Sequence, residues 1–107
     1  MSGIDDRENT FENKFAHDQE LEFKANARRN KLLGLWAAEL MGMDGETATE
    51  YAKTVVVADF EEAGDDDVFR KIRGDFDAKR VDMSDHLLRK QMDELLAVAR
   101  QQVQTES

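Results

Sequence analysis

The stretch "ELEFKANARRNKLLGLWAAELMG", residues 20–42, carries the clearest helical pattern in the chain. Its apolar residues recur at intervals of three and four, which is the spacing of one face of an α-helix. That face comprises Leu21, Ala25, Leu32, Leu35, Trp36 and Leu40, with Arg28 and Glu39 at the same spacing and Leu33 and Ala37 beside it. Asp18 is suited to cap the start of such a helix and Gly42 to end it in a left-handed conformation. The pattern therefore predicts a helix over about 18–41.

Three shorter amphipathic segments follow, over about 45–62, 66–78 and 85–103. Asp44, Asp65 and Ser84 precede them, and each has a side chain that can cap a helix. The run Val55-Val56-Val57 favours a strand by composition, but it lies inside a helical pattern and is interpreted as helix. Four helices with short connections predict an all-α fold, a four-helix bundle over 18–107. Its expected core is Leu32, Trp36, Phe60, Phe69, Phe76, Leu88, Met92 and Leu95.

The segment ahead of this pattern, residues 1–17, is dense in charge and poor in apolar residues. After Ile4 it offers only Phe11, Phe15 and Ala16, too little apolar surface to offset the entropy of ordering a separate helix. We therefore expect a flexible arm with latent helicity. On a helix, Phe11 and Phe15 would share one face. They either extend the first helix and pack on the bundle, or anchor an arm that folds into a partner's groove; their spacing alone does not choose.

The length, net charge and cysteine content of the chain disfavour several classes of function. The 107 residues match one domain, and the formal net charge of −9 disfavours binding to nucleic acid or anionic lipid. The chain has no Cys, which excludes thiolate chemistry and fits a reducing cytoplasm. Neither a signal peptide nor an apolar membrane span is present in the sequence, so we expect no direct membrane insertion.

Motifs for catalysis, cofactors and metals are weak. Asp59-x-Glu61 resembles the start of a calcium loop, but Arg70 stands where the final carboxylate ligand belongs. His17 and His86 lack a metal-ligand spacing. His86 is expected on the surface, whereas His17, where arm meets bundle, could serve as a pH-sensitive hinge. We expect no metal, no cofactor and no enzymatic activity.

Charge is unevenly distributed along the chain. Basic residues gather in the first helix (Lys24, Arg28, Arg29, Lys31) and in the third (Arg70, Lys71, Arg73), and an acidic block, Asp59–Asp67, lies between them. One interpretation is intramolecular pairing across a solvated face, with each exposed pair worth about 0–1 kcal/mol. The other is a docking surface that orients a protein partner.

Three blocks carry a resemblance to a known family: "DDRENTFENKF" (5–15), "KFAHDQELEFKANARRNKLLGLWAAELMG" (14–42) and "ADFEEAGDDDVFRKIRGDF" (58–76). On these blocks the chain resembles the zeta-subunit inhibitor family of alphaproteobacterial F-type ATP synthases, over nearly its whole length. It departs from the family pattern at Ile4, where an aromatic residue is common, and at Ala63, where a proline is common. The first departure bears on inhibitory strength and the second on one turn.

The resemblance implies a four-helix bundle with a mobile inhibitory arm. In the family the arm inserts between catalytic and non-catalytic subunits of the synthase head, near the rotor, and blocks rotation in the hydrolytic direction. Carried over, the partner-binding residues are Asp5, Asp6, Arg7, Glu8, Phe11, Glu12, Lys14, Phe15 and His17. Phe11 and Phe15 would be apolar anchors.

The same resemblance implies a cytoplasmic protein, peripheral to the inner membrane through the synthase, and we expect a monomer when it is free. The alternative is an acidic helical adaptor, without enzymatic activity, that docks on another complex through its charged face. In that case the arm would be no more than a frayed end.

Overall fold

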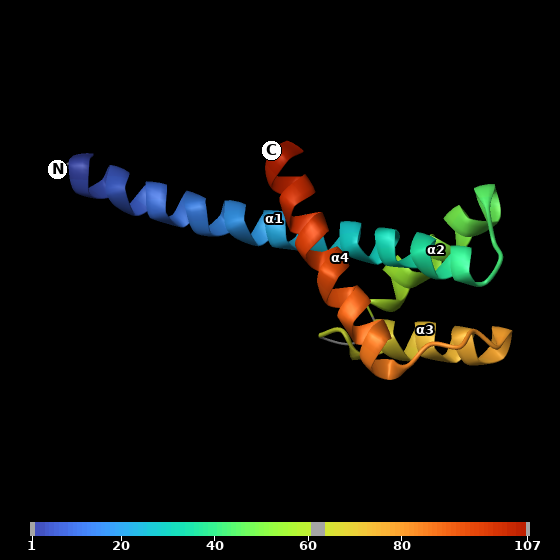
Figure 1. Ribbon diagram of the computed structural model, residues 1–107. Helices are drawn as coiled ribbons and strands as arrows, with labels where there is room; N and C mark the ends of the chain where they lie inside the picture. The colour runs from blue at the N-terminus through green and yellow to red at the C-terminus, as the bar shows by residue number, and fades with distance from the viewer. Residues whose placement is uncertain (1, 61–63, 107) are drawn as a thin grey trace.

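The structure, a computed structural model, describes residues 2–60 and 64–106, with side chains described from His17 onward. These residues form four helices and no strand: α1 (Ser2–Leu40), α2 (Gly45–Ala58), α3 (Asp66–Lys79) and α4 (Asp85–Glu106). The all-α prediction is confirmed, and the valine run at 55–57 is helical. Figure 1 shows α1 as the longest element, with the other helices gathered around its C-terminal half.

The start of α1 differs from the prediction. The helix begins at Ser2 and runs without interruption for 39 residues, so Asp18 lies inside it and does not cap it. Neither glycine nor proline occurs between Gly3 and Gly34, and extending an existing helix is much easier than nucleating one. The backbone of residues 2–17 is thus continuous with the bundle, and the separate behaviour of the 1–17 arm stays a prediction.

A tight turn joins α1 to α2. Gly42 has a φ of +82°, and the Met43 N–H donates to the Ala38 carbonyl at 2.9 Å, which closes the helix as predicted. Because this turn is short, α2 runs back alongside α1. The two backbones come closest at Gly34, where an added Cβ would stand 2.6 Å from the Ala52 Cα. A glycine is therefore required here for a steric reason.

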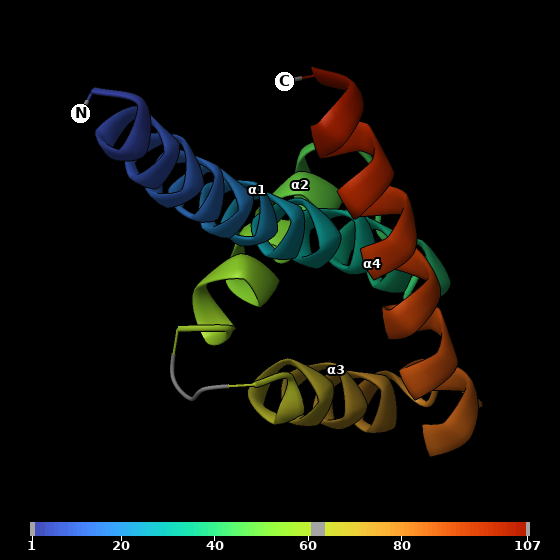
Figure 2. The ribbon, with the colours of Figure 1, turned by 90° about the vertical axis from the view of Figure 1, so that its left-hand side faces the viewer.

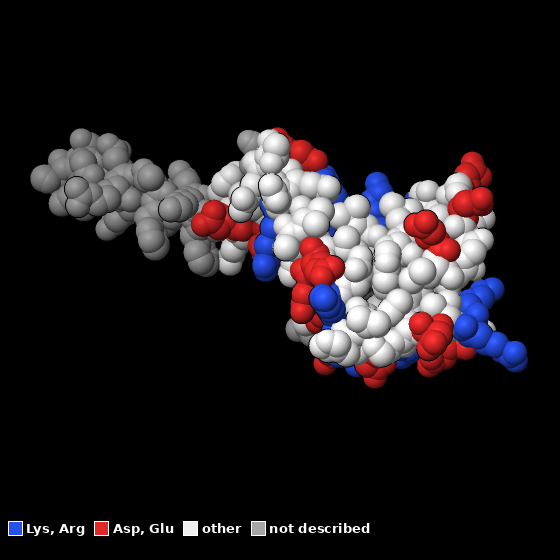
Figure 3. All heavy atoms as spheres, in the orientation of Figure 1, with Lys and Arg blue, Asp and Glu red and all other residues white. Residues whose placement is uncertain are grey.

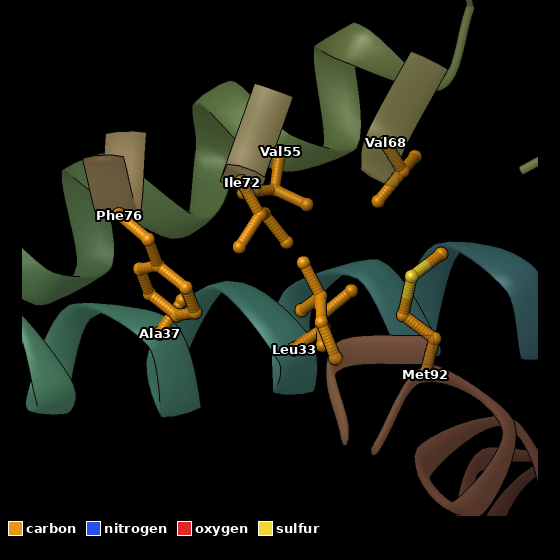
Figure 4. Packing of buried hydrophobic residues seen from close by; sticks show 8 residues of the cluster. Leu33, Ala37, Val55, Val68, Ile72, Phe76 and Met92 are labelled. Atoms are coloured by element: carbon orange, nitrogen blue, oxygen red, sulfur yellow. The ribbon is translucent and has the colours of Figure 1, made fainter. Parts of the chain in front are cut away.

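The hydrophobic core lies where all four helices meet. Figure 4 shows Leu33 and Ala37 of α1 facing Ile72 and Phe76 of α3, with Val55 of α2 beside Ile72 and Met92 of α4 to one side. The buried cluster consists of Leu33, Ala37, Val55, Val68, Ile72, Phe76, Leu88 and Met92. Trp36 packs against it, edge to face with Phe76 at a centroid distance of 5.8 Å.

Two expected core residues are placed differently. Leu32 is only half-buried, whereas its neighbour Leu33 is fully buried, because α1 is covered on two sides by α2 and α4 and its inward face is centred one residue further on. Phe60 is 71% exposed. The reason is that α2 ends at Ala58 and not near 62, so Phe60 falls beyond the buried stripe; carboxylates after Ala58 oppose the negative end of the helix dipole.

The remaining helices close the structure at an angle. Figures 1 and 2 show α4 crossing α1, with α3 lying below α1 and α2 and joined to the base of α4. The Ser84 hydroxyl accepts a hydrogen bond from the Leu87 N–H at 3.1 Å, as predicted for a cap of α4. Asp44 and Asp65 occupy N-cap positions, but neither side chain makes a capping hydrogen bond, which corrects the prediction for both.

Candidate functional site

The predicted partner-binding residues lie on the first half of α1. The side chains of Asp5, Asp6, Arg7, Glu8, Phe11, Glu12, Lys14 and Phe15 are outside the described residues. Their backbone is helical and extends away from the other three helices (Figure 1). His17, the last of the predicted set, is described and is exposed. The structure thus brings the predicted stretch together on one projecting segment, and the roles of the individual side chains stay predictions.

Where this segment joins the bundle, two ion pairs connect α1 to the C-terminal half of α4. The Arg28 guanidinium donates to both carboxylate oxygens of Glu106 at 2.8 and 2.7 Å. Arg100 donates to both oxygens of Glu22 at 3.1 and 2.6 Å. We call these four residues the α1–α4 clamp. Bidentate pairs of this kind fix the orientation of the guanidinium relative to the carboxylate as well as the distance between them.

The α1–α4 clamp lowers the pKa of both of its carboxylates. The hydrogen bonds from Arg100 hold the pKa of Glu22 below its usual value, although partial burial opposes them. Arg28 lowers the pKa of Glu106 in the same way. Both carboxylates are largely solvated, so their contribution to stability is modest and is screened by salt.

A buried polar cluster lies deeper, between α1 and the start of α3. Arg29 is 1% exposed; its Nη2 donates to Asp65 at 2.7 Å and its Nε to the Asn30 side-chain oxygen at 2.7 Å. Asp59 borders this cluster, and burial raises its pKa while a hydrogen bond with Asn30 lowers it. The nearby carboxylate of Asp67 raises it further. This cluster ties α1 to the α2–α3 connection.

Most of the charges described as patches are paired within the chain. Lys24 pairs with Glu20, Lys71 with Asp75, and Arg73 with both Asp77 and Asp85, in addition to the Arg28 and Arg29 pairs above. Asp66 of the acidic block pairs with Arg89. Figure 3 shows acidic and basic side chains interspersed on the visible face. The interpretation of intramolecular pairing is confirmed for these residues; Lys31 makes no ion pair within the described part of the chain.

No group of three His, Asp or Glu side chains among the described residues is arranged to hold a metal ion. No described helix combines the length and the apolarity needed to cross a bilayer. His86 is exposed at the start of α4, as expected from the sequence.

The clamp was not anticipated from the sequence. Its partners stand 78 residues apart, and charged residues are so frequent in this chain that no local spacing marks those two pairs. The burial of Arg29 was missed for a related reason, because a basic residue next to Arg28 and Lys31 is typical of a solvated face.

Comparisons with known proteins agree with this architecture. Residues 1–102 match the family described as ATPase inhibitor subunit zeta. A solved solution NMR structure is 49% identical in sequence, covers 81% of this chain and 99% of its own, and superposes with a TM-score of 0.72. No curated protein matches. A family match over almost the entire length, supported by a solved structure with the same fold, means that the chain belongs to the ATPase inhibitor subunit zeta family.

Proposed function

We propose that this protein inhibits ATP hydrolysis by an F-type ATP synthase, with the projecting half of α1 as the inhibitory element. Membership of an ATPase inhibitor family supports the role itself. The observation that carries the mechanism is the continuity of α1, which joins the predicted stretch Asp5–Phe15 to the bundle as one helix. The partner is the catalytic head of the synthase, including catalytic, non-catalytic and rotor subunits.

Residues 2–17 of α1 span roughly 24 Å at 1.5 Å per residue, which is enough to reach into a cleft while the bundle stays outside it. Positions 11 and 15 are one helical turn apart, so two phenylalanines can enter a single apolar pocket. Burying both would contribute roughly 3–6 kcal/mol before ordering costs. A segment that is already helical loses less conformational entropy on binding than an extended one.

A wedge at a moving interface requires no chemistry of its own. It must only be costly to expel in one direction of rotation, and a continuous helix transmits force to the bundle. The clamp on Glu22 and Arg28 would then brace α1 just behind the inserted segment. The second candidate, an adaptor that docks through its charged face, is less favoured because most of those charges are paired within the chain.

The test is ATP hydrolysis by the purified catalytic head of the cognate synthase. We expect the full-length protein to inhibit, and a variant lacking residues 1–16 to lose inhibition while its remaining residues still unfold cooperatively when followed by circular dichroism. Replacing both Phe11 and Phe15 by Ala should weaken inhibition strongly, whereas replacing Thr10 by Ala, immediately before Phe11 in sequence, should not. Equal inhibition by the truncated and the full-length protein would refute the arm as the inhibitory element.

A further inference from the structure

A groove separates α1 from α2 on the side away from the core cluster. Its larger part has a volume of about 730 Å³, and its apolar floor is made by Leu35, Ala52, Val56 and Val57. A second hollow of about 180 Å³ shares Val56 with it. We call the two hollows together the α1–α2 groove. Its shape follows from the close approach at Gly34, because small residues there bring the two helices together and leave a trough along their line of contact.

The most exposed large apolar side chains of the described chain all lie in this groove or at its end. Phe60 is 71% exposed, Val57 63% and Phe23 62%. Phe23 and Phe60 line the smaller hollow, and Val57 lines the larger one. Single exposed apolar residues are normal on a protein surface, but three that converge on one groove are typical of an interaction site.

The charges at the groove differ from those of the whole chain. The formal net charge is −9, yet the ionisable side chains that line the larger hollow are Lys31 and Lys53, with no described carboxylate among its lining residues. The smaller hollow is lined by one carboxylate, that of Asp59. The Lys53 Nζ lies 3.5 Å from the Glu50 Oε1. Their side chains are 68% and 73% exposed, so this ion pair is weak. Lys31 makes no ion pair with a described residue. An acidic ligand would therefore find one lysine unpaired among the described residues and one weakly paired lysine beside the apolar floor of the larger hollow.

We propose that the α1–α2 groove docks an acidic amphipathic helix of the synthase head. The inference rests on the proposed function for the identity of the partner. From Phe23 to Leu35 the groove follows α1 for roughly 18 Å, which matches about three turns of a bound helix. Such a helix would lay its apolar face over Val56, Val57 and Phe60 and its carboxylates over the two lysines.

If the groove docks on the head, the affinity for the head and the block of rotation depend on different parts of the chain. The arm stops rotation, whereas the groove holds the bundle on the head and raises the effective concentration of the arm at its cleft. Loss of the groove contact should therefore shift the concentration needed for inhibition without changing the inhibition reached at saturation.

The experiment is an inhibition titration of the purified catalytic head with full-length variants, accompanied by a direct measurement of binding. In the groove variant Lys31→Glu and Lys53→Glu are combined; in the control, Lys24→Glu and Lys90→Glu produce the same change of net charge outside the groove. We expect the groove variant to need at least tenfold more protein for half-inhibition, with an unchanged plateau. The control should stay within about twofold of the parent. An unchanged half-inhibition and unchanged affinity of the groove variant would overturn the proposal.

Crosslinking identifies the occupant. A photoreactive phenylalanine replaces Val57, and in a matched control it replaces Val98, an exposed apolar residue of α4. The proposal expects an adduct from position 57 on an acidic helical segment of the head and little from position 98. An adduct only with a second copy of this chain, or equal yields from both positions, would overturn it.

The two proposals fail differently. A chain that binds the head without inhibiting it contradicts the proposed function, and the binding data of the groove variant then decide the groove. A chain that does not bind the head refutes both.

Discussion

The close approach of α1 and α2 gives a sharp prediction about two glycines. Gly34 of α1 and Gly74 of α3 both lie inside helices and both have ordinary helical φ values. An added Cβ at Gly34 would meet the Ala52 Cα at 2.6 Å, whereas at Gly74 it would meet nothing within 4 Å. The same substitution to alanine should therefore have opposite effects at the two positions.

The magnitudes follow from two terms. Replacing glycine by alanine inside a helix stabilises by about 1 kcal/mol at either position. At Gly34 the clash is with backbone, so α1 and α2 must separate, and overpacking of this kind costs about 3 kcal/mol. We expect Gly34→Ala to lose about 2 kcal/mol of unfolding free energy and Gly74→Ala to gain about 1 kcal/mol.

Thermal unfolding followed by circular dichroism measures both variants. At about 4–8 °C per kcal/mol for a domain of this size, Gly34→Ala should lower Tm by roughly 10 °C and Gly74→Ala should raise it by roughly 5 °C. Urea titration should give the same order of stabilities. If both variants gained stability equally, helix propensity alone would govern Gly34 and the packing of α1 on α2 would be described wrongly.

Three further predictions concern caps and acidity. Ser84→Ala should cost about 1 kcal/mol in a urea titration, and Asp44→Ala clearly less, because only the Ser84 side chain makes a capping hydrogen bond; equal losses would contradict this. Burial raises the pKa of Asp59 in the folded protein above its ordinary value of 3.8. The folded state therefore holds this proton more tightly than the unfolded state, and it loses that stabilisation as pH rises from below 3.8 through the raised pKa. Asp59→Asn should therefore have a higher Tm than the parent at pH 7 and the same Tm near pH 3, and a lower Tm at pH 7 would refute the reasoning. The pKa of Glu22 is lowered by Arg100, so its contribution is present above pH 4.5 and is lost as pH falls through the lowered pKa. Glu22→Gln should cost up to about 1 kcal/mol at pH 7 in low salt and nothing at strongly acidic pH; a loss that does not depend on pH would exclude the ion pair as its cause.

Local patterns in the sequence predicted the elements well. The spacing of apolar residues located four helices, Gly42 located the end of α1, and Ser84 located the start of α4. Each of these signals acts within about one helical turn, so a single sequence contains it in full. The predicted start of α1 was wrong because residues 1–17 are poor in apolar side chains, yet no glycine or proline after Gly3 interrupts the extension of the helix there.

Contacts between different helices were harder to predict from the sequence than the helices themselves. The burial of Arg29 depends on Asp65 reaching it from another element, and the exposure of Phe60 depends on where α2 ends. The clamp joins residues at opposite ends of the chain. Such pairings depend on how the helices are packed, and a charge-rich sequence offers many alternatives of similar local appearance. The α1–α2 groove could not be predicted from the sequence either, because its apolar residues belong to two helices whose relative placement depends on Gly34.

The proposed inhibition acts on hydrolysis and not on synthesis, and it depends on the projecting half of α1. The most direct test measures ATP hydrolysis and ATP synthesis in the same energised membrane vesicles that carry the cognate synthase, before and after addition of the full-length protein. We expect hydrolysis to fall strongly when the proton gradient is removed, while synthesis under a gradient stays nearly unchanged. Equal suppression of both reactions, or no effect on hydrolysis at saturating protein, would contradict it.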